Sequence, residues 1–288
     1  MNFIMTVLRP AFVASTWIIS ALIISACASH TPPPPDIKLY VFQCGDIEVR
    51  DVSVFSPGIN KGQHKLLTDS CYLIRHPKGD LIWDAGLPDQ LGAKGQEFYD
   101  GLFYMSMPTP LQEQLKAIGV KPEEIEWLGI SHAHSDHTGN ANLFSNATLL
   151  MQKEEFDAAF GENPQQYGFV PDSYNHFSAA NTRQLQGDYD VFGDGRVVVK
   201  RAIGHTPGHQ MLYLDMPESG RIVLSGDLYH FTSNREQRRV PSFNFSKEHT
   251  LESMERMEQF LESTGAQLWI QHDKEQNATI RHAPEYYR

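Results

Sequence analysis

The stretch His132-Ala133-His134-Ser135-Asp136-His137 places three imidazoles and one carboxylate within a few residues of one another. No apolar spacing separates them, so packing in a hydrophobic core does not account for the set. Imidazole nitrogens and carboxylate oxygens that converge from one turn bind a borderline cation such as zinc. His132 and His134 can bind one ion while Asp136 and His137 face a second, so the stretch predicts a metal site.

Strand-like runs end just before this stretch and before each further histidine or aspartate that stands out. Rigid strands commonly present site residues on loops at one edge of an α/β sheet. The pattern therefore predicts an α/β fold with one site built from four strand ends. The runs are residues 125–130 before His132, 197–203 before His205, 221–224 before Asp227 and 268–270 before His272.

The remaining pattern has no second linker and predicts one body. Residues 37–42, 67–75 and 81–83 are typical of strands, and the turn at 76–79 makes the last two antiparallel. Helices are expected at 110–118 and 247–263, and the second should cover the core with Met254 and Met257 as packing residues. The aromatic segment 86–110 either caps an apolar pocket or covers the sheet edge.

Several motifs together resemble the metallo-β-lactamase superfamily. The resemblance extends over nearly all of the chain after its N-terminal segment. It implies an αββα sandwich with metals at one edge, between the sheets. The motifs are His-x-His-x-Asp-His at 132–137, Gly-His-Thr-Pro-Gly-His at 204–209, Ser-Gly-Asp at 225–227, Gln-His-Asp at 271–273 and Asp-Ala-Gly at 84–86.

The resemblance also implies a ligand set for two divalent metal ions, with Zn²⁺ expected, although manganese, iron and cobalt accept the same ligands. His209 is expected to orient another ligand through its free ring nitrogen. An exchange of roles between His205 and His209 stays open. The implied ligands are His132, His134 and His205 for one ion, Asp136, His137 and His272 for the other, and Asp227 as the bridge.

Two neighbouring cations stabilise a bridging hydroxide at neutral pH and polarise a carbonyl, so hydrolysis is the expected reaction. The resemblance implies that Asp136 passes a proton to the leaving oxygen. Zinc β-lactamases carry Cys or Ser where this chain has Asp227, which disfavours antibiotic hydrolysis.

Within the superfamily, further segments resemble the N-acyl-homoserine lactonases, the quorum-quenching group. That resemblance implies opening of a lactone ring by the bridging hydroxide. A secreted organophosphate or aryl-ester hydrolase and a non-catalytic metal-binding lipoprotein are the alternatives. The segments are Tyr40-Val41-Phe42, Ser70-Cys71-Tyr72-Leu73, His205-Thr206-Pro207-Gly208-His209-Gln210 and Pro284-Glu285-Tyr286.

One position departs from that group. Many such lactonases carry a tyrosine three residues after the bridging aspartate, where it donates a hydrogen bond to the lactone carbonyl. Here that place is His230, preceded by Tyr229. Either His230 donates this bond or Tyr229 reaches the substrate, and a purely structural role for His230 is the alternative.

The charge balance excludes polyanionic partners. The chain carries 24 Lys and Arg against 35 Asp and Glu, a formal net charge of −11. Binding to phosphate backbones needs a basic surface, so no nucleic acid is expected. The predicted partner is a small lactone or ester, and a homodimer is possible.

The N-terminus is typical of an export signal, because Arg9 precedes an apolar segment, 11–24, that is short for a membrane span. Ile24-Ser25-Ala26-Cys27 resembles a lipobox, which predicts a lipoprotein signal peptide at 1–26 and lipidation of Cys27. Ordinary cleavage at the same small residues is the alternative. A proline-rich linker at 27–36 and a hydrolase domain at 37–288 follow. The expected location is the periplasm, anchored to the outer membrane.

Only Cys44 and Cys71 remain after Cys27. In an oxidising compartment they can form a disulfide, and two buried thiols are the alternative.

Overall fold

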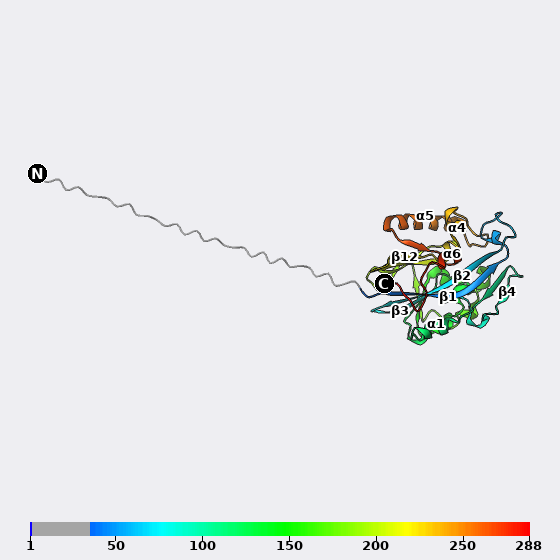
Figure 1. The fold of residues 1–288 in the computed structure, drawn as a ribbon, viewed down its shortest axis with the longest axis horizontal. Coiled ribbons are helices and arrows are strands. Elements are labelled where there is room, and N and C mark those ends of the chain that lie inside the picture. Colours follow the sequence, from blue (N-terminus) through cyan, green and yellow to red (C-terminus); the bar gives the residue numbers. More distant parts are fainter. Residues whose placement is uncertain (2–34) are drawn as a thin grey trace. The chain divides into compact units, whose positions relative to one another are not determined.

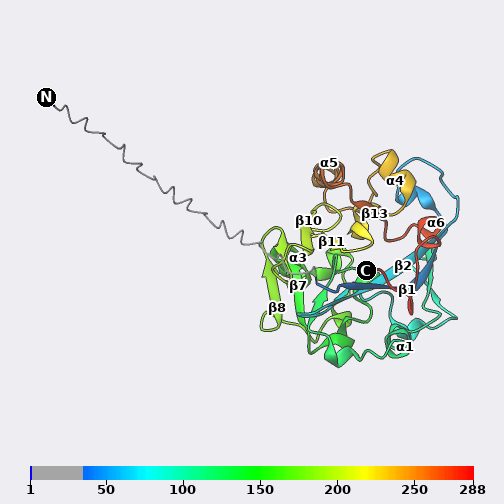
Figure 2. The same ribbon diagram turned by 60° about the vertical axis from the view of Figure 1, so that its left-hand side comes forward.

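The computed structural model describes Met1 and residues 35–288, so the predicted signal peptide and Cys27 lie outside the described residues. Residues 35–288 lie within one compact unit. Two sheets stack face to face, with α5 on one outer side and α1 on the other (Figure 1). The turned view shows the same four layers (Figure 2). In the part of the chain that the structure describes, no helix has the length and hydropathy to cross a bilayer.

The larger sheet has eight strands in the order β4-β5-β1-β2-β3-β6-β7-β8. These are β1 (Lys38–Val49), β2 (Lys65–His76), β3 (Gly79–Trp83), β4 (Gln96–Phe98), β5 (Phe103–Ser106), β6 (Trp127–Gly129), β7 (Thr148–Gln152) and β8 (Thr182–Leu185). The smaller sheet has the order β13-β12-β11-β10-β9. Its strands are β9 (Tyr189–Asp190), β10 (Val197–Arg201), β11 (Gln210–Met216), β12 (Gly220–Leu224) and β13 (Gln267–Trp269).

The α-helices are α1 (Leu111–Ala117), α2 (Ser135–Thr138), α3 (Lys153–Ala159), α4 (Thr232–Glu236), α5 (Lys247–Thr264) and α6 (Lys274–Asn277). The two stacked sheets, with helices on both outer sides, confirm the predicted αββα sandwich.

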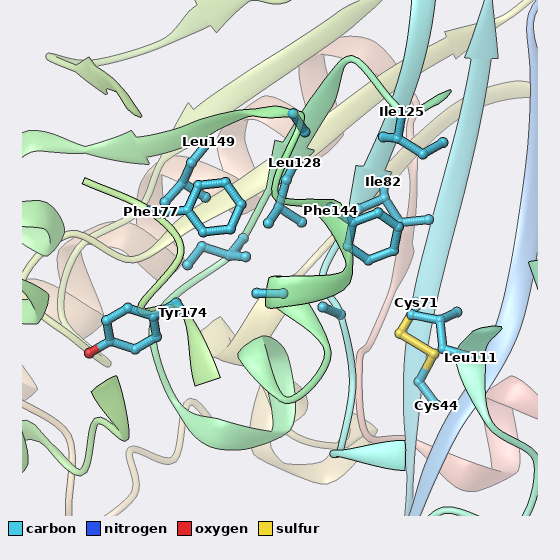
Figure 3. Close-up of a cluster of buried hydrophobic side chains, with 14 of the residues drawn as sticks. Cys44, Cys71, Ile82, Leu111, Ile125, Leu128, Phe144, Leu149, Tyr174 and Phe177 are labelled. Atoms are coloured by element: carbon cyan, nitrogen blue, oxygen red, sulfur yellow. A yellow bond between two sulfur atoms is a disulfide. The ribbon is translucent and has the colours of Figure 1, made fainter. Parts of the chain in front are cut away.

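The alternation of side chains along β2 sends successive residues into two different cores. Successive residues of a strand point to opposite faces of a sheet. Tyr72 and Ile74 thus pack between the two sheets, while Cys71 and Leu73 join the core beneath α1. That second core, which contains Leu111 of α1, is drawn in Figure 3.

Helix α5 covers the outer face of the smaller sheet, as its apolar stripe predicts. Met254, Met257 and Leu261 are buried against residues of the sheet. The helix begins where the Ser246 side chain accepts a hydrogen bond from the His249 N–H, and it ends at Gly265, whose φ is 67°. Both predicted methionines are packing residues.

The first strand is longer than its sequence suggests. The pattern predicts a strand over 37–42, but β1 continues to Val49. A register shift between Gln43 and Gly45 lets the pairing with β2 continue past the glycine. A bulge of this kind inserts a residue without ending the strand, so the polar Gly45-Asp46 is not a terminus.

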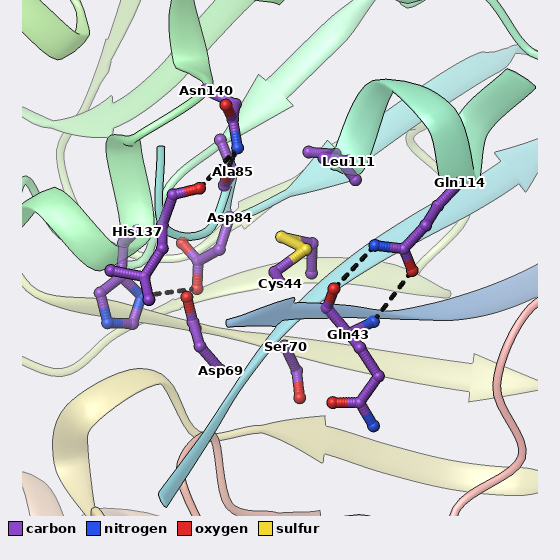
Figure 4. Close-up of a disulfide and its surroundings, with 12 residues drawn as sticks. Gln43, Cys44, Asp69, Ser70, Asp84, Ala85, Leu111, Gln114, His137 and Asn140 are labelled. Carbon is purple, nitrogen blue, oxygen red and sulfur yellow. Dashed lines mark hydrogen bonds and ion pairs between the residues drawn. A yellow bond between two sulfur atoms is a disulfide. The ribbon is translucent and has the colours of Figure 1, made fainter. Parts of the chain in front are cut away.

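Cys44 and Cys71 form a disulfide between the neighbouring strands β1 and β2 (Figure 4). Of the two alternatives left open by the sequence, the structure has the bonded pair. The turn after β3 lies directly against it, because a Cβ added at Gly86 would be 2.4 Å from the Cβ of Cys44. The disulfide therefore supports the turn that carries Asp84.

Candidate metal centre

The strand ends deliver the predicted residues to one place. His132 and His134 follow β6, and the short helix α2 presents Asp136 and His137 directly afterwards. The remaining members are His205 after β10, Asp227 in the turn after β12 and His272 after β13. They form two groups able to hold a metal ion: His132, His134, His205 and Asp227, and Asp136, His137 and His272.

In the first ligand group, three ring nitrogens converge. His132 Nε2 lies 2.8 Å from His134 Nδ1, and His205 Nε2 lies 3.1 Å from each of them. The Oδ2 atom of Asp227 is 3.4 Å from His205 Nε2 and 3.8 Å from His132 Nε2. These four atoms therefore face a common point.

In the second ligand group, the other oxygen of Asp227 takes part. Its Oδ1 lies 3.1 Å from His272 Nε2 and 3.3 Å from His137 Nε2. Asp136 Oδ2 is 3.8 Å and 3.9 Å from the same two nitrogens. The Asp227 carboxylate thus offers one oxygen to each group, which is the geometry of a bridge.

Backbone carbonyls fix the tautomers of two histidines. His134 Nε2 is 2.8 Å from the carbonyl oxygen of Tyr167, and His272 Nδ1 is 2.8 Å from that of Thr68. A carbonyl only accepts, so these nitrogens carry the hydrogen and donate it. In the neutral rings, His134 Nδ1 and His272 Nε2 then carry no hydrogen, and each directs a lone pair toward the site.

Side chains do the same for two more histidines. His137 Nδ1 lies 3.0 Å from Asp84 Oδ2, and His205 Nδ1 lies 3.0 Å from Asn244 Oδ1. An imidazole whose outer N–H is held by a carboxylate or carbonyl is oriented toward a metal through its other nitrogen. The Asp-Ala-Gly motif at 84–86 therefore supplies an orienting carboxylate.

Lone pairs at these distances repel one another unless a cation lies between them. His137 Nε2 and Asp227 Oδ1 are buried, and within the described residues neither has a hydrogen-bond partner. Burying such atoms without compensation is costly. The donor set of imidazoles and carboxylates is suited to zinc and similar divalent ions, so the residues present fit two such ions.

The electrostatics of the site agree with that donor chemistry. Burial, reinforced by the neighbouring imidazoles, holds the pKa of His132 and His205 well below the ordinary range, so both are neutral. Burial opposes ionisation of Asp227, but His272 and His137 outweigh it and hold the carboxyl pKa low. For His272 burial opposes the charge, yet Asp227 raises the pKa to about 9. Neutral imidazoles and an ionised carboxylate are the forms that bind metal, so His272 must release its proton when an ion binds.

His209 lies where its predicted indirect role requires. Its Nδ1 donates to the carbonyl oxygen of Ala202 at 2.9 Å, and its Nε2 accepts the backbone N–H of Asp227 at 2.9 Å. Both ring nitrogens are thus used, and it is His205 that faces the ligand groups. His209 positions the backbone of Asp227.

Two buried carboxylates near the site could not be predicted from the sequence. Burial raises the pKa of Asp69, whose Oδ1 accepts a hydrogen bond from Gln271 Nε2 at 2.8 Å. Burial also raises the pKa of Glu155 to about 7, although backbone N–H groups oppose that shift. Each sits in an unremarkable strand or helix sequence, so no local signal marks them.

A pocket of about 670 Å³ opens beside the ligand groups. The aromatic segment supplies part of its wall through Tyr99, Phe103 and Met105, and Phe55 and Phe243 supply more. The prediction that this segment caps an apolar pocket is confirmed for those three residues. Among the described residues, no lysine or arginine lines the pocket.

The structure separates the two candidates that follow the bridging aspartate. His230 lines the pocket, with Nε2 3.2 Å from Asp227 Oδ2 and its ring 4.5 Å from that of Phe55. Tyr229 points the other way and donates its hydroxyl to Glu258 at 2.8 Å. Tyr229 is therefore not brought to the site, because consecutive residues in extended backbone face opposite sides.

The sequence profile of the metallo-beta-lactamase superfamily matches residues 66–264. The two-sheet sandwich and the ligand groups at its edge agree with this match. The chain belongs to the metallo-β-lactamase superfamily, as its motifs predict.

Several similar proteins within the superfamily are lactonases. The N-acyl homoserine lactonase AttM of Azorhizobium caulinodans is 28% identical over 264 residues, which cover 88% of this chain and 99% of the relative. An N-acyl homoserine lactonase of Bacillus thuringiensis is 27% identical and covers 86% of this chain and 98% of its own length. A solved N-acyl homoserine lactone hydrolase, with N-hexanoyl-L-homoserine bound at its catalytic metal centre, matches with a TM-score of 0.76 at 27% identity, covering 86% of this chain and 98% of that one.

Proposed function

We propose that this protein is a two-metal hydrolase that opens the lactone ring of N-acyl-homoserine lactones. The observation that supports the proposal most directly is the orientation of the Asp227 carboxylate, which directs one oxygen toward each ligand group. The lactonases that this chain resembles over nearly their whole length supply the substrate class.

The pocket suits a neutral amphiphile. Its lining includes aromatic and aliphatic side chains such as Phe55 and Phe103, together with the ligand groups and uncharged polar residues. A substrate with an obligatory carboxylate would be expected to meet a cationic side chain. Without lysine or arginine in the described lining, an uncharged lactone with an acyl chain fits better than a β-lactam acid.

Two bound divalent ions would supply an activated water and a Lewis acid for the lactone carbonyl. The chain's own groups would do the rest. His230, at the pocket wall, would donate a hydrogen bond to the carbonyl oxygen. Asp136, which lines the same pocket, would take a proton from the attacking water and pass it to the leaving oxygen of the opened ring.

The test is a substrate panel on the zinc-loaded protein. It includes homoserine lactones with short and long acyl chains, aryl esters, phosphotriesters and β-lactams. The proposal expects the highest kcat/KM on the lactones. Preferential turnover of the phosphotriesters would favour the organophosphate hydrolase, and no turnover at all would overturn the enzymatic role.

For the cell, we propose export to the periplasm and anchoring through lipidated Cys27. The disulfide between Cys44 and Cys71 supports export, because such bonds persist in oxidising compartments. Cys27→Ser should move the protein from the membrane fraction to the soluble fraction. Unchanged fractionation of that variant would contradict the anchor.

A further inference from the structure

Glu155 is a buried carboxylate in the first turn of α3, 1% exposed, and it does not line the pocket beside the ligand groups. Both of its oxygens are occupied by backbone donors. Oε1 accepts the N–H of Ala133 at 2.8 Å, and Oε2 accepts the N–H of Gly208 at 2.7 Å. Only the ionised carboxylate accepts on both oxygens, and hydrogen bonds to a charged acceptor are about twice as strong as neutral ones.

The two donors belong to the two loops that carry the first ligand group. Ala133 lies between His132 and His134, while Gly208 lies three residues after His205. These loops are far apart in the sequence and follow strands of different sheets. One carboxylate thus sets the spacing between them.

The backbone at Gly208 lies so close to Glu155 that no side chain would fit between them. A Cβ added at Gly208 would be 2.4 Å from the backbone nitrogen of Glu155 and 2.6 Å from its Cβ. The loop after β10 therefore packs directly against the first turn of α3.

The second ligand group is anchored elsewhere. The outer nitrogen of His137 is held by Asp84, and that of His272 by the carbonyl of Thr68. Neither support passes through α3. A change at Glu155 should consequently lower the binding affinity for one ion much more than for the other.

We propose that Glu155 is the positioning residue that assembles the His132, His134 and His205 site from two separate loops, and that it sets the affinity of that ion selectively. The proposal rests on the two-ion part of the proposed function and not on the identity of the substrate.

The conservative variant Glu155→Gln tests the geometry. An amide keeps one acceptor oxygen but turns an NH₂ toward a backbone N–H, so one of the two bonds is replaced by a contact between donors. Changes to groups that orient metal ligands typically cost about 10- to 100-fold in affinity. The matched control is Glu154→Gln, because the adjacent Glu154 has a half-exposed side chain and pairs with Arg201 on the surface.

Metal-stripped wild type, Glu155→Gln and Glu154→Gln are titrated with Co²⁺ and followed by visible absorbance and calorimetry. His205→Asn and His272→Asn identify which binding step belongs to which group. The expected result is a loss of about 10- to 100-fold in the His205 step of Glu155→Gln, with the His272 step within about twofold of wild type. Glu154→Gln should titrate as the wild type does.

The proposal is overturned if Glu155→Gln titrates as wild type, or if both steps weaken equally. If circular dichroism shows that metal-free Glu155→Gln does not fold, Glu155→Asp decides by the same criteria, since its shorter side chain cannot reach both N–H groups. A wild type that takes no second ion would instead overturn the two-metal centre. Two-step binding without lactone turnover would overturn only the substrate assignment.

Discussion

Asp227→Asn should remove one metal ion and abolish hydrolysis. The carboxylate presents Oδ1 to His272 and His137, at 3.1 and 3.3 Å, and Oδ2 to His205, at 3.4 Å. An amide has one oxygen and an NH₂ group that cannot bind a cation. The variant can therefore serve one ligand group but not both.

The magnitude follows from the lost ligand. Removing a group that only orients a ligand already costs about 10- to 100-fold in metal affinity, so a direct bridge should cost more than about 100-fold. That corresponds to at least about 2.7 kcal/mol for the ion that loses its oxygen. Loss of a buried negative charge between two cations acts in the same direction.

The assay is metal content after dialysis against micromolar zinc, together with kcat for lactone opening. We expect the content to fall from about two ions per chain to about one. Asp215→Asn is the control, because Asp215 lies on the surface between Arg196 and Arg221. A variant that keeps two ions and full activity would refute the bridging role.

Three further outcomes are expected. His230→Phe should lower kcat by about 100-fold, the effect of losing one hydrogen-bond donor to a developing oxyanion, while Tyr229→Phe should leave kcat nearly unchanged; equal effects would contradict the different placement of the two side chains. Replacing both Cys44 and Cys71 by serine should lower the free energy of unfolding by about 3.5 kcal/mol in urea denaturation, because the bond closes a loop of 27-residue separation; unchanged stability would show that the bond does not constrain the chain. Chelation should lower Tm by about 10 to 20 °C, since two ions at 100 times their Kd contribute about 5 kcal/mol; a Tm insensitive to chelator would argue against resident ions.

The strand ends and the presence of a metal site could be predicted because their signals are local, while the division of the ligands into two groups followed from the resemblance to the superfamily. A β-rich run followed by a histidine is visible in any window of the sequence, and the cluster at 132–137 needs no information from elsewhere. The continuation of β1 past Gly45 could not be predicted, because it depends on pairing with β2 across a bulge.

The supports of the site could not be predicted for a different reason. Glu155 acts through N–H groups of Ala133 and Gly208, which any residue except proline possesses. The choice between Tyr229 and His230 likewise depended on which side of the extended backbone faces the pocket. Sequence gives the identity of neighbours along the chain, and these contacts are between loops brought together by folding.

The backbone carbonyls behind His134 and His272 affect how such a site can vary or be transplanted. Tyr167 and Thr68 contribute only their carbonyl oxygens to those histidines, so other side chains at both positions would preserve the tautomers if the chain path were kept. A search for such centres by residue identity would overlook these supports. An engineer who grafts the centre onto another scaffold must copy the course of these two loops and not merely the residues that face the ions.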